Sequence, residues 1–249
     1  MTNLISLNLD DNQIVDISPL ANLSDLIGLT LNENFVVDLS ALADLTNLTG
    51  LQLDANAVVD VSPLANLTRL TWLSLGDNQI TDISPLTNLR ELTLLDLGTN
   101  QITDVSPLEN LTSLTELNLD NNAIADPSPL AGLTNLRTLD LGHTQTMDIS
   151  PLASLTNLDG LILNANSITD VSPLANLTDL SFLTLNENQV TDISPLADLT
   201  DLISLSLSNN QIEDASSLAN LSNLQELWLE DNPLGDRTCP VQPEAICRF

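Results

Sequence analysis

The chain has 249 residues, and 43% of them are hydrophobic, which is ample for a sizeable core built mainly from aliphatic side chains. Thirty-four acidic residues oppose five arginines, and the formal net charge of -29 makes nucleic acids and anionic membrane surfaces poor partners. No apolar run reaches the roughly 18 residues of a membrane span, so we expect no membrane insertion.

A spacing of 22 residues fills the chain, and it decides the architecture before any single element is assigned. A column of asparagines steps by 22 and is interrupted once, by Thr144: Asn12, Asn34, Asn56, Asn78, Asn100, Asn122, Asn166, Asn188, Asn210 and Asn232. An unbroken column of aspartates follows: Asp16, Asp38, Asp60, Asp82, Asp104, Asp126, Asp148, Asp170, Asp192 and Asp214. Because every copy carries them, both columns are predicted to be structural and not catalytic.

One copy, residues 70–91, shows the expected elements in order. Alternation in its "LSLGD" segment predicts a short strand with one apolar face. The asparagine is expected to point inward and to bond backbone groups at the bend after the strand. Ser84 is predicted to cap a helical turn that Pro85 begins, and the few residues left before the next strand favour a 3₁₀ segment.

The two ends of the chain depart from the pattern. Leu4, Leu7 and Leu9 predict a first coil with one bare apolar side, from which we expect that an N-terminal cap is missing or that an oligomer buries this end. The last residues, "NPLGDRTCPVQPEAICRF", are predicted to fold over the final coil as a cap. Cys239 and Cys247 could form a disulfide there or remain thiols.

The repeat L-x-x-L-x-L-x-x-N-x-I-x-D-[IV]-S-P-L-x-x-L-T-x resembles the bacterial leucine-rich repeat of the 22-residue, internalin-like type. The resemblance covers ten full copies and the strand of an eleventh, and predicts a solenoid over residues 1–235 and a cap over 236–249. It implies an α/β fold with a parallel sheet on the concave face and short 3₁₀ turns on the convex face. It also implies non-enzymatic binding of proteins through the concave face, and it favours a secreted or cell-surface protein although the chain carries no signal peptide.

Candidate binding residues are those that vary between copies, because the repeated ones are explained by the fold. The outward strand positions are mostly small or polar, but large apolar residues interrupt them in two pairs, with acids and the chain's one histidine between the pairs. The predicted binding residues are Trp72, Leu94, Asp96, Glu116, Asp120, Asp140, His143, Ile162 and Phe182. Aromatic anchors beside acids are typical of a surface for a basic protein or peptide, bound by a monomer.

Three other hypotheses remain. The array could be a passive or engineered scaffold without a dedicated ligand. Oxygen ligands from Asp96, Asn118, Asp120 and Asp140 could hold a calcium-like cation, although no calcium-binding loop supports this and we assign no metal site. His143 could act as a base, but no nucleophile, oxyanion site or cofactor motif accompanies it, so the sequence predicts neither an enzyme nor a cofactor.

The copy "LGHTQTMDIS", residues 141–150, replaces the usual asparagine with Thr144 and an isoleucine with Thr146. Thr144 cannot donate and accept as an amide does, and Thr146 reduces the aliphatic layer. One interpretation is drift tolerated by regular neighbours. The other is a local rearrangement that presents His143 and Asp140 at the edge of the acidic region.

Overall fold

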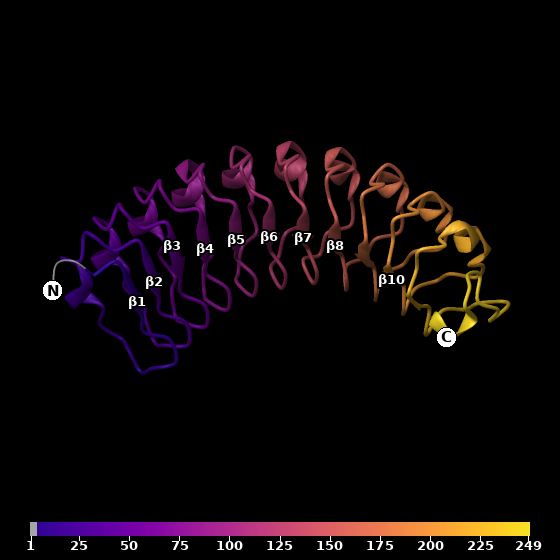
Figure 1. Ribbon diagram of the computed structural model, residues 1–249, viewed down its shortest axis with the longest axis horizontal. Helices are drawn as coiled ribbons and strands as arrows, with labels where there is room; N and C mark the ends of the chain where they lie inside the picture. Colours follow the sequence, from indigo (N-terminus) through magenta and orange to yellow (C-terminus); the bar gives the residue numbers. More distant parts are fainter. Residues whose placement is uncertain (1–3) are drawn as a thin grey trace. The chain divides into compact units, whose positions relative to one another are not determined.

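The computed structural model describes residues 4–249, which divide between residues 123 and 124 into two compact units. Residues 1–3, where the predicted solenoid begins, lie outside the described residues. Each unit is a stack of coils in which a three-residue strand alternates with a 3₁₀ turn. Figure 1 shows, for each unit, the strands on one side of the coils and the 3₁₀ turns on the other.

The first unit contains strands β1 (Ser6–Asn8), β2 (Gly28–Thr30), β3 (Gly50–Gln52), β4 (Trp72–Ser74), β5 (Leu94–Asp96) and β6 (Glu116–Asn118). Its turns are η1 (Ser18–Leu20), η2 (Ser40–Leu42), η3 (Ser62–Leu64), η4 (Ser84–Asn88) and η5 (Ser106–Leu108). The predicted 3₁₀ segments are therefore confirmed.

The second unit contains strands β7 (Thr138–Asp140), β8 (Gly160–Ile162), β9 (Phe182–Thr184), β10 (Ser204–Ser206), β11 (Glu226–Trp228) and β12 (Cys247–Arg248). Its turns are η6 (Ser128–Gly132), η7 (Ser150–Ser154), η8 (Ser172–Leu174), η9 (Ser194–Leu196), η10 (Ser216–Asn220) and η11 (Glu244–Ile246). The twelfth strand and the last turn were not predicted from the sequence.

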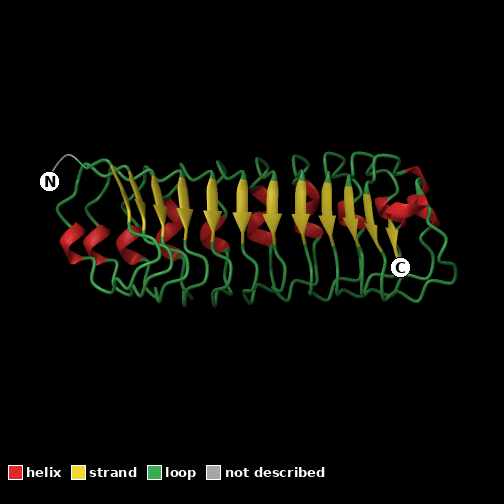
Figure 2. Cartoon of the chain, turned by 60° about the horizontal axis from the view of Figure 1, so that its bottom comes forward, coloured by secondary structure: helices red, strands yellow, loops and turns green. Residues whose placement is uncertain are grey.

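Strands within each unit pair in parallel and in sequence order, and the register repeats the 22-residue period. Leu7 lies opposite Leu29 in the first unit, and Leu183 lies opposite Leu205 in the second. Figure 2 shows the strands of each unit side by side and pointing in one direction. Equivalent positions of successive copies therefore form straight columns across the sheet, so a surface can be read from the outward columns.

The core consists of the aliphatic positions of each copy, stacked on their counterparts in the next coil. In residues 70–91 the buried set is Leu70, Leu73, Leu75, Ile80, Ile83, Leu86, Leu89, each at most 1% exposed. Burying one such side chain contributes about 1.5 to 3 kcal/mol relative to leaving it in water. The first coil differs as expected: Leu4, Leu7 and Leu9 are only half-buried.

The asparagine column joins successive coils through its amides, as predicted. The amide nitrogen of Asn78 donates to the carbonyl oxygens of Leu53, Leu75 and Gly76, each at 3.0 Å. Its oxygen accepts the N–H of Val58 at 2.9 Å. One buried side chain therefore satisfies backbone groups in its own coil and in the preceding one, which the bend after the strand would otherwise leave unpaired.

The aspartate column holds the first residue of the 3₁₀ turns η1 to η10, and the N-cap of η4 is Ile83, which makes no side-chain cap hydrogen bond. The prediction that Ser84 is the N-cap is wrong: Ser84 is the first residue of η4, and its N–H donates to Asp82 Oδ1 at 2.8 Å. The carboxylate two residues earlier is better placed because it forms an Asx-type turn with that N–H. These bonds, the backbone one first and a serine hydroxyl bond second, lower the pKa of Asp82 below its ordinary value.

The C-terminal segment extends the sheet by one strand. β12 pairs in parallel with β11, with Cys247 opposite Leu227, and a disulfide joins Cys247 to Cys239. The alternative of free thiols is therefore excluded for this structure. The cystine closes a short loop and both of its cysteines are buried, while the assignment of residues 236–249 as a cap stays a prediction.

Candidate functional site on the sheet face

The outward side chains of the strands form a surface that we call the sheet face. It consists of the first and third residue of each strand, and each unit has its own. In the first unit Trp72 lies between Gly50 and Leu94 in the register, so the predicted Trp72–Leu94 pair is adjacent. Trp72 is 45% exposed, and Leu94 is half-buried. The indole therefore stands above small and half-buried neighbours and is accessible to a partner.

Of the acids predicted for this unit, Asp96 uses its carboxylate to hold backbone of its own coil, whereas the carboxylate of Asp120 accepts the side-chain amide of the adjacent Asn121, at 2.8 Å. Asp96 Oδ1 accepts the N–H of Gly98 at 2.9 Å and the amide of Asn118 at 3.1 Å. Asn118 Oδ1 in turn accepts the N–H of Asp120 at 3.0 Å. Glu116 is exposed on the outward column and remains available for steering a charged partner.

A ladder of side-chain acceptors precedes the bond that Asp96 makes. In earlier coils the second residue after the strand accepts the N–H of its counterpart 22 residues later. Asn32 Oδ1 accepts Asp54 N–H at 2.9 Å, and Asp54 Oδ1 accepts Gly76 N–H at 2.7 Å. Gly76 has no side chain to continue the series, so the N–H of Gly98 turns to Asp96 within its own coil.

Asp54 is the one carboxyl of this ladder whose pKa is raised. Burial raises it most, while hydrogen bonds from the Ser74 hydroxyl and the Gly76 N–H oppose the shift, and the charges of Asp96 and Asp10 add to it. The hydroxyl of Ser74 lies 2.7 Å from both carboxylate oxygens of Asp54. Sequence reasoning did not select Asp54, because the repeat pattern alone does not show that this side chain folds back over the next strand.

In the second unit Asp140, Ile162 and Phe182 occupy the sheet face as predicted from the alternation. Asp140 lies opposite Ile162 in the register and accepts the N–H of Gly142 at 2.8 Å. Ile162 is half-buried, and Phe182 is 38% exposed. The five predicted residues of the first unit and the four of the second are each placed within their own unit, and their assignment as one binding surface stays a prediction.

His143 occupies the turn after β7 and is exposed. Its φ of 54° is shared by the corresponding residue of the other copies, such as Glu187 at 58°. The histidine therefore adopts the ordinary backbone of its column. The conformational change in this copy falls instead on Gln145, whose φ of 71° has no counterpart in the regular copies.

Two hydroxyls replace the missing amide in this copy. Thr144 and Thr146 are fully buried, and their hydroxyl oxygens lie 2.9 Å apart. Thr144 donates to Leu141 O and Thr146 to Ile124 O, both at 2.8 Å. Asn166 Oδ1 accepts the N–H of Thr146 at 2.9 Å. The pair of substitutions is thus an internally satisfied variant of the turn, which favours tolerated drift over presentation of His143.

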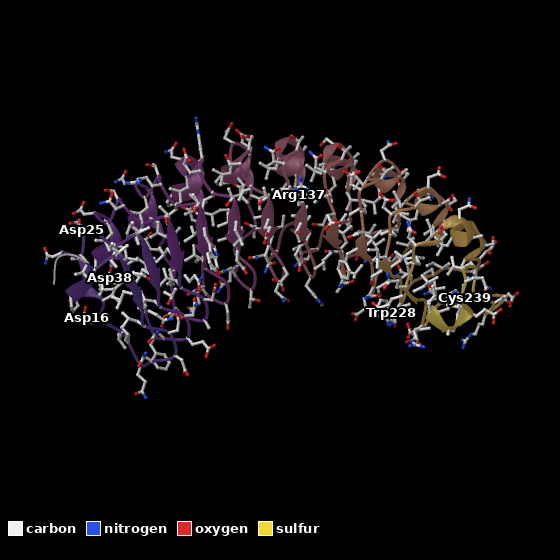
Figure 3. All side chains as sticks on the ribbon, viewed as in Figure 1. Asp16, Asp25, Asp38, Arg137, Trp228 and Cys239 are labelled. Atoms are coloured by element: carbon white, nitrogen blue, oxygen red, sulfur yellow. A yellow bond between two sulfur atoms is a disulfide. The ribbon has the colours of Figure 1, made fainter. Side chains whose placement is uncertain are left out.

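A hollow of about 460 Å³ lies on the sheet face of the second unit, across β9, β10 and β11. Phe182 stands on one side and Trp228 on the other, with the buried Ser206 between them on the intervening strand. Its remaining lining residues are Thr184, Asn186, Ser208 and Glu230. Figure 3 labels Trp228 close to the C-terminal end of this unit, where Cys239 is also labelled.

Sequence reasoning found only Phe182 of this hollow. Trp228 is the third residue of β11 and faces outward, but it was not among the predicted binding residues, which were taken from the middle of the outward columns. The sequence did contain a signal for the hollow. Phe182 and Trp228 are 46 positions apart, which places them on outward positions of two strands with one strand between them, and that strand carries only serines at its outward positions.

Among residues 4–249 no group of three or more His, Cys, Asp or Glu could hold a metal ion, and no helix has the length and apolar character to cross a membrane. The cation hypothesis therefore gains no support. Two of its oxygen ligands, on Asp96 and Asn118, are already engaged by neighbouring backbone N–H groups.

Comparison with known families gives four consecutive matches to the model described as leucine rich repeats (2 copies), over residues 68–110, 112–154, 156–198 and 200–236. The chain belongs to the leucine-rich repeat family. No curated protein gives a significant match to the sequence.

Solved structures refine this assignment to the internalin type. An internalin (inlF) of Listeria monocytogenes is 36% identical with a TM-score of 0.76, over 94% of this chain and 82% of that one. Internalin C2 of the same organism is 42% identical with a TM-score of 0.70, over 74% and 82%. The chain is therefore an internalin-like bacterial leucine-rich repeat protein.

A more distant neighbour was solved with a partner bound. The ectodomain of the receptor kinase GASSHO1/SCHENGEN3 of Arabidopsis thaliana, in complex with Casparian strip integrity factor 2, is 25% identical with a TM-score of 0.66. The match covers 93% of this chain but 36% of that one. Leucine-rich repeat proteins commonly mediate protein binding, and this family membership sets the expected class of function.

Proposed function

We propose that this internalin-like chain is a non-enzymatic module that binds a protein or peptide through its sheet face. The observation that carries the proposal is the exposure of Trp72 and Phe182 on strands whose other outward residues are mostly small or polar. Exposed aromatic side chains on a rigid sheet provide contact area at a low cost in conformational entropy, which is why they are enriched where partners bind.

The charge of the chain indicates the chemistry of the partner. With 34 acidic and five basic residues, the protein attracts cationic partners and repels nucleic acids. Glu116 is exposed beside Leu94 in the register of the first unit, and Glu230 lines the hollow of the second unit. A protein or peptide with basic side chains is therefore the favoured class, and its association rate would fall as salt concentration rises.

The test is capture of partners from a mixed bacterial and host proteome with three forms of the protein. The first is the wild type, the second carries Trp72→Ala and Phe182→Ala, and the third carries Phe35→Ala as a matched control. Phe35 is 58% exposed but lies outside the strands, in the loop after β2. The proposal predicts proteins that the wild type and the control retain and the sheet-face variant loses.

Equal retention by all three forms would contradict the proposal. It would move the passive scaffold hypothesis ahead, since a scaffold without a ligand has no reason to depend on two aromatic residues of the sheet face. Each variant is first shown by circular dichroism to retain the wild-type spectrum, so that loss of binding is not loss of fold.

A further inference from the structure

The hollow across β9, β10 and β11 has features that the fold does not require. We propose that it holds one large apolar side chain of an extended peptide, with a neighbouring lysine or arginine of that peptide on Glu230. This inference rests on the proposed function and specifies one site and one chemical class for it.

The dimensions suit a single apolar side chain lying flat over the sheet. Phe182 and Trp228 stand two strands apart and two residues apart along the strand direction, about 12 Å in all at the usual strand spacing and rise. Ser206 between them is buried and small, so the floor leaves room for an inserted group. The volume of about 460 Å³ falls in the range of ordinary ligand sites, roughly 300 to 1,000 Å³.

The hydroxyl of Thr184 is the second observation that indicates a ligand. This residue lines the hollow and is 8% exposed, yet its Oγ1 atom is buried without a hydrogen-bond partner. Ser204, opposite Phe182 in the register, is also 8% exposed and has a buried hydroxyl without a partner. An unsatisfied buried hydroxyl costs free energy in the unbound protein. A peptide backbone group crossing β9 would supply the missing partner of Thr184 when rotation about χ1 brings this buried hydroxyl to the surface; Ser204 does not line the hollow.

The floor beside these hydroxyls is already fixed in place. Asn186 Oδ1 accepts the Ser206 hydroxyl at 2.6 Å and the N–H of Ser208 at 2.8 Å. The hydroxyl of Ser208 donates to Glu230 Oε2 at 2.8 Å, which holds this carboxylate at the edge of the hollow. The site is therefore largely preformed, and preformed polar groups reduce the cost of ordering on binding.

Charge complementarity selects a basic occupant. Glu230 lines the hollow, and three further acids lie on β11 or on the turns that follow β9 and β11: Glu187, Glu226 and Asp231. The one basic residue on strands β9 to β12 is Arg248, opposite Trp228 on the far side from the hollow. A cationic side chain next to the inserted apolar group would thus meet Glu230 at the rim, with other acids on the neighbouring strand and turns.

Selection from a display library of random seven-residue peptides tests the inference, because the library supplies every combination of apolar and charged neighbours. The proteins used are the wild type, Phe182→Ala with Trp228→Ala, Trp72→Ala, Glu230→Gln, and Ile203→Ala as the control. Ile203 is 44% exposed and directly precedes β10, outside the hollow. Each variant is checked for a wild-type urea midpoint before selection.

The wild type and the control are expected to enrich peptides in which a large apolar residue stands next to lysine or arginine. A synthetic peptide of the enriched sequence is expected to lose about thirtyfold in affinity for the double variant, as for loss of a central aromatic anchor. Glu230→Gln keeps an acceptor for Ser208 but removes the charge, so it is expected to remove the preference for the basic residue and much of the salt dependence.

The outcomes separate this inference from the proposed function. If the double variant enriches the same peptides as the wild type, and Trp72→Ala does not, the sheet face binds peptides elsewhere and the hollow is refuted alone. If no form enriches any peptide, both ideas fail. A wild type that sediments as a dimer and a double variant that sediments as a monomer would show that a second copy covers the hollow, which would also overturn the inference.

Discussion

Truncation of one asparagine in the buried column gives the sharpest test of how the coils are held together. Asn188 is 5% exposed, and its amide nitrogen donates to Leu163 O, Leu185 O and Asn186 O at 2.9, 3.0 and 3.2 Å. Its oxygen accepts the N–H of Ile168 at 3.0 Å. Asn188→Ala would remove all of these bonds and leave their buried partners unsatisfied.

The expected loss is about 2 to 4 kcal/mol, since each bond contributes about 0.5 to 1.5 kcal/mol net and carbonyl oxygens keep a second lone pair. The matched control is Asn157→Ala, because Asn157 is exposed and makes one bond, to Thr134 O at 2.8 Å. That variant is expected to lose about 0.5 kcal/mol.

Urea unfolding followed by circular dichroism measures both losses from the shift in midpoint at an unchanged slope. If Asn188→Ala and Asn157→Ala differ by less than about 0.5 kcal/mol, the asparagine column does not have the structural role assigned to it. A change in the slope of the unfolding curve for Asn188→Ala alone would indicate that one coil unfolds separately. Repeat proteins can unfold in this way because each coil contacts only its neighbours.

Three further predictions follow from single contacts. Thr184→Val is expected to stabilise the protein by about 1 kcal/mol, because the buried hydroxyl of Thr184 has no hydrogen-bond partner. Thr30 occupies the same column position but donates to an aspartate at 2.9 Å, so Thr30→Val is expected to destabilise the protein. The urea midpoints of the two variants should therefore shift in opposite directions from that of the wild type, and shifts in the same direction would contradict the reasoning. Asp82→Asn is expected to lower the melting temperature at neutral pH, because the ionised carboxylate of Asp82 stabilises the folded state. The difference from the wild type should vanish as the pH falls below the ordinary pKa of 3.8 and through the lowered pKa of the folded state. A difference that persists in acid would exclude this cause. Replacing Cys239 and Cys247 by serine is expected to destabilise the C-terminal strand by about 2.5 kcal/mol, seen as faster amide exchange in the last coil with the first unit unchanged, and uniform exchange in both forms would argue against a capping role.

The fold could be predicted almost completely because the same pattern of apolar, polar and turn residues recurs in every 22-residue copy. Leu73 and Leu75 alternate with outward residues, which predicts a strand. The asparagine recurs after each strand, which predicts that its amide bonds backbone groups at the bend. The period does not predict which N–H group a particular carboxylate accepts, nor the path of the chain after the last copy. Ser84 was therefore wrongly predicted to be the N-cap, whereas its N–H donates to Asp82, and β12 was missed because its two residues carry no repeat signal.

The candidate site was less predictable, because it depends on residues that the period does not constrain. Asp96 was selected as a surface acid, yet its carboxylate compensates for Gly76, a residue in the preceding copy that has no side chain. The hollow was missed because it forms where a side chain is small: Ser206, on the strand between Phe182 and Trp228, does not fill the space between these two aromatic side chains. Such a gap becomes visible only when the register of three strands is known.

The most direct test of binding through the sheet face uses the two tryptophans of the chain. Trp72 on β4 lies on the sheet face of the first unit and Trp228 on β11 on that of the second, so each indole N–H signal in a ¹H–¹⁵N correlation spectrum reports on the sheet face of its own unit. Adding a peptide or protein that binds the wild type is expected to shift or broaden at least one of these signals. If a complex forms, as shown by sedimentation, and both indole signals stay unchanged at saturation, binding occurs elsewhere and the account is contradicted.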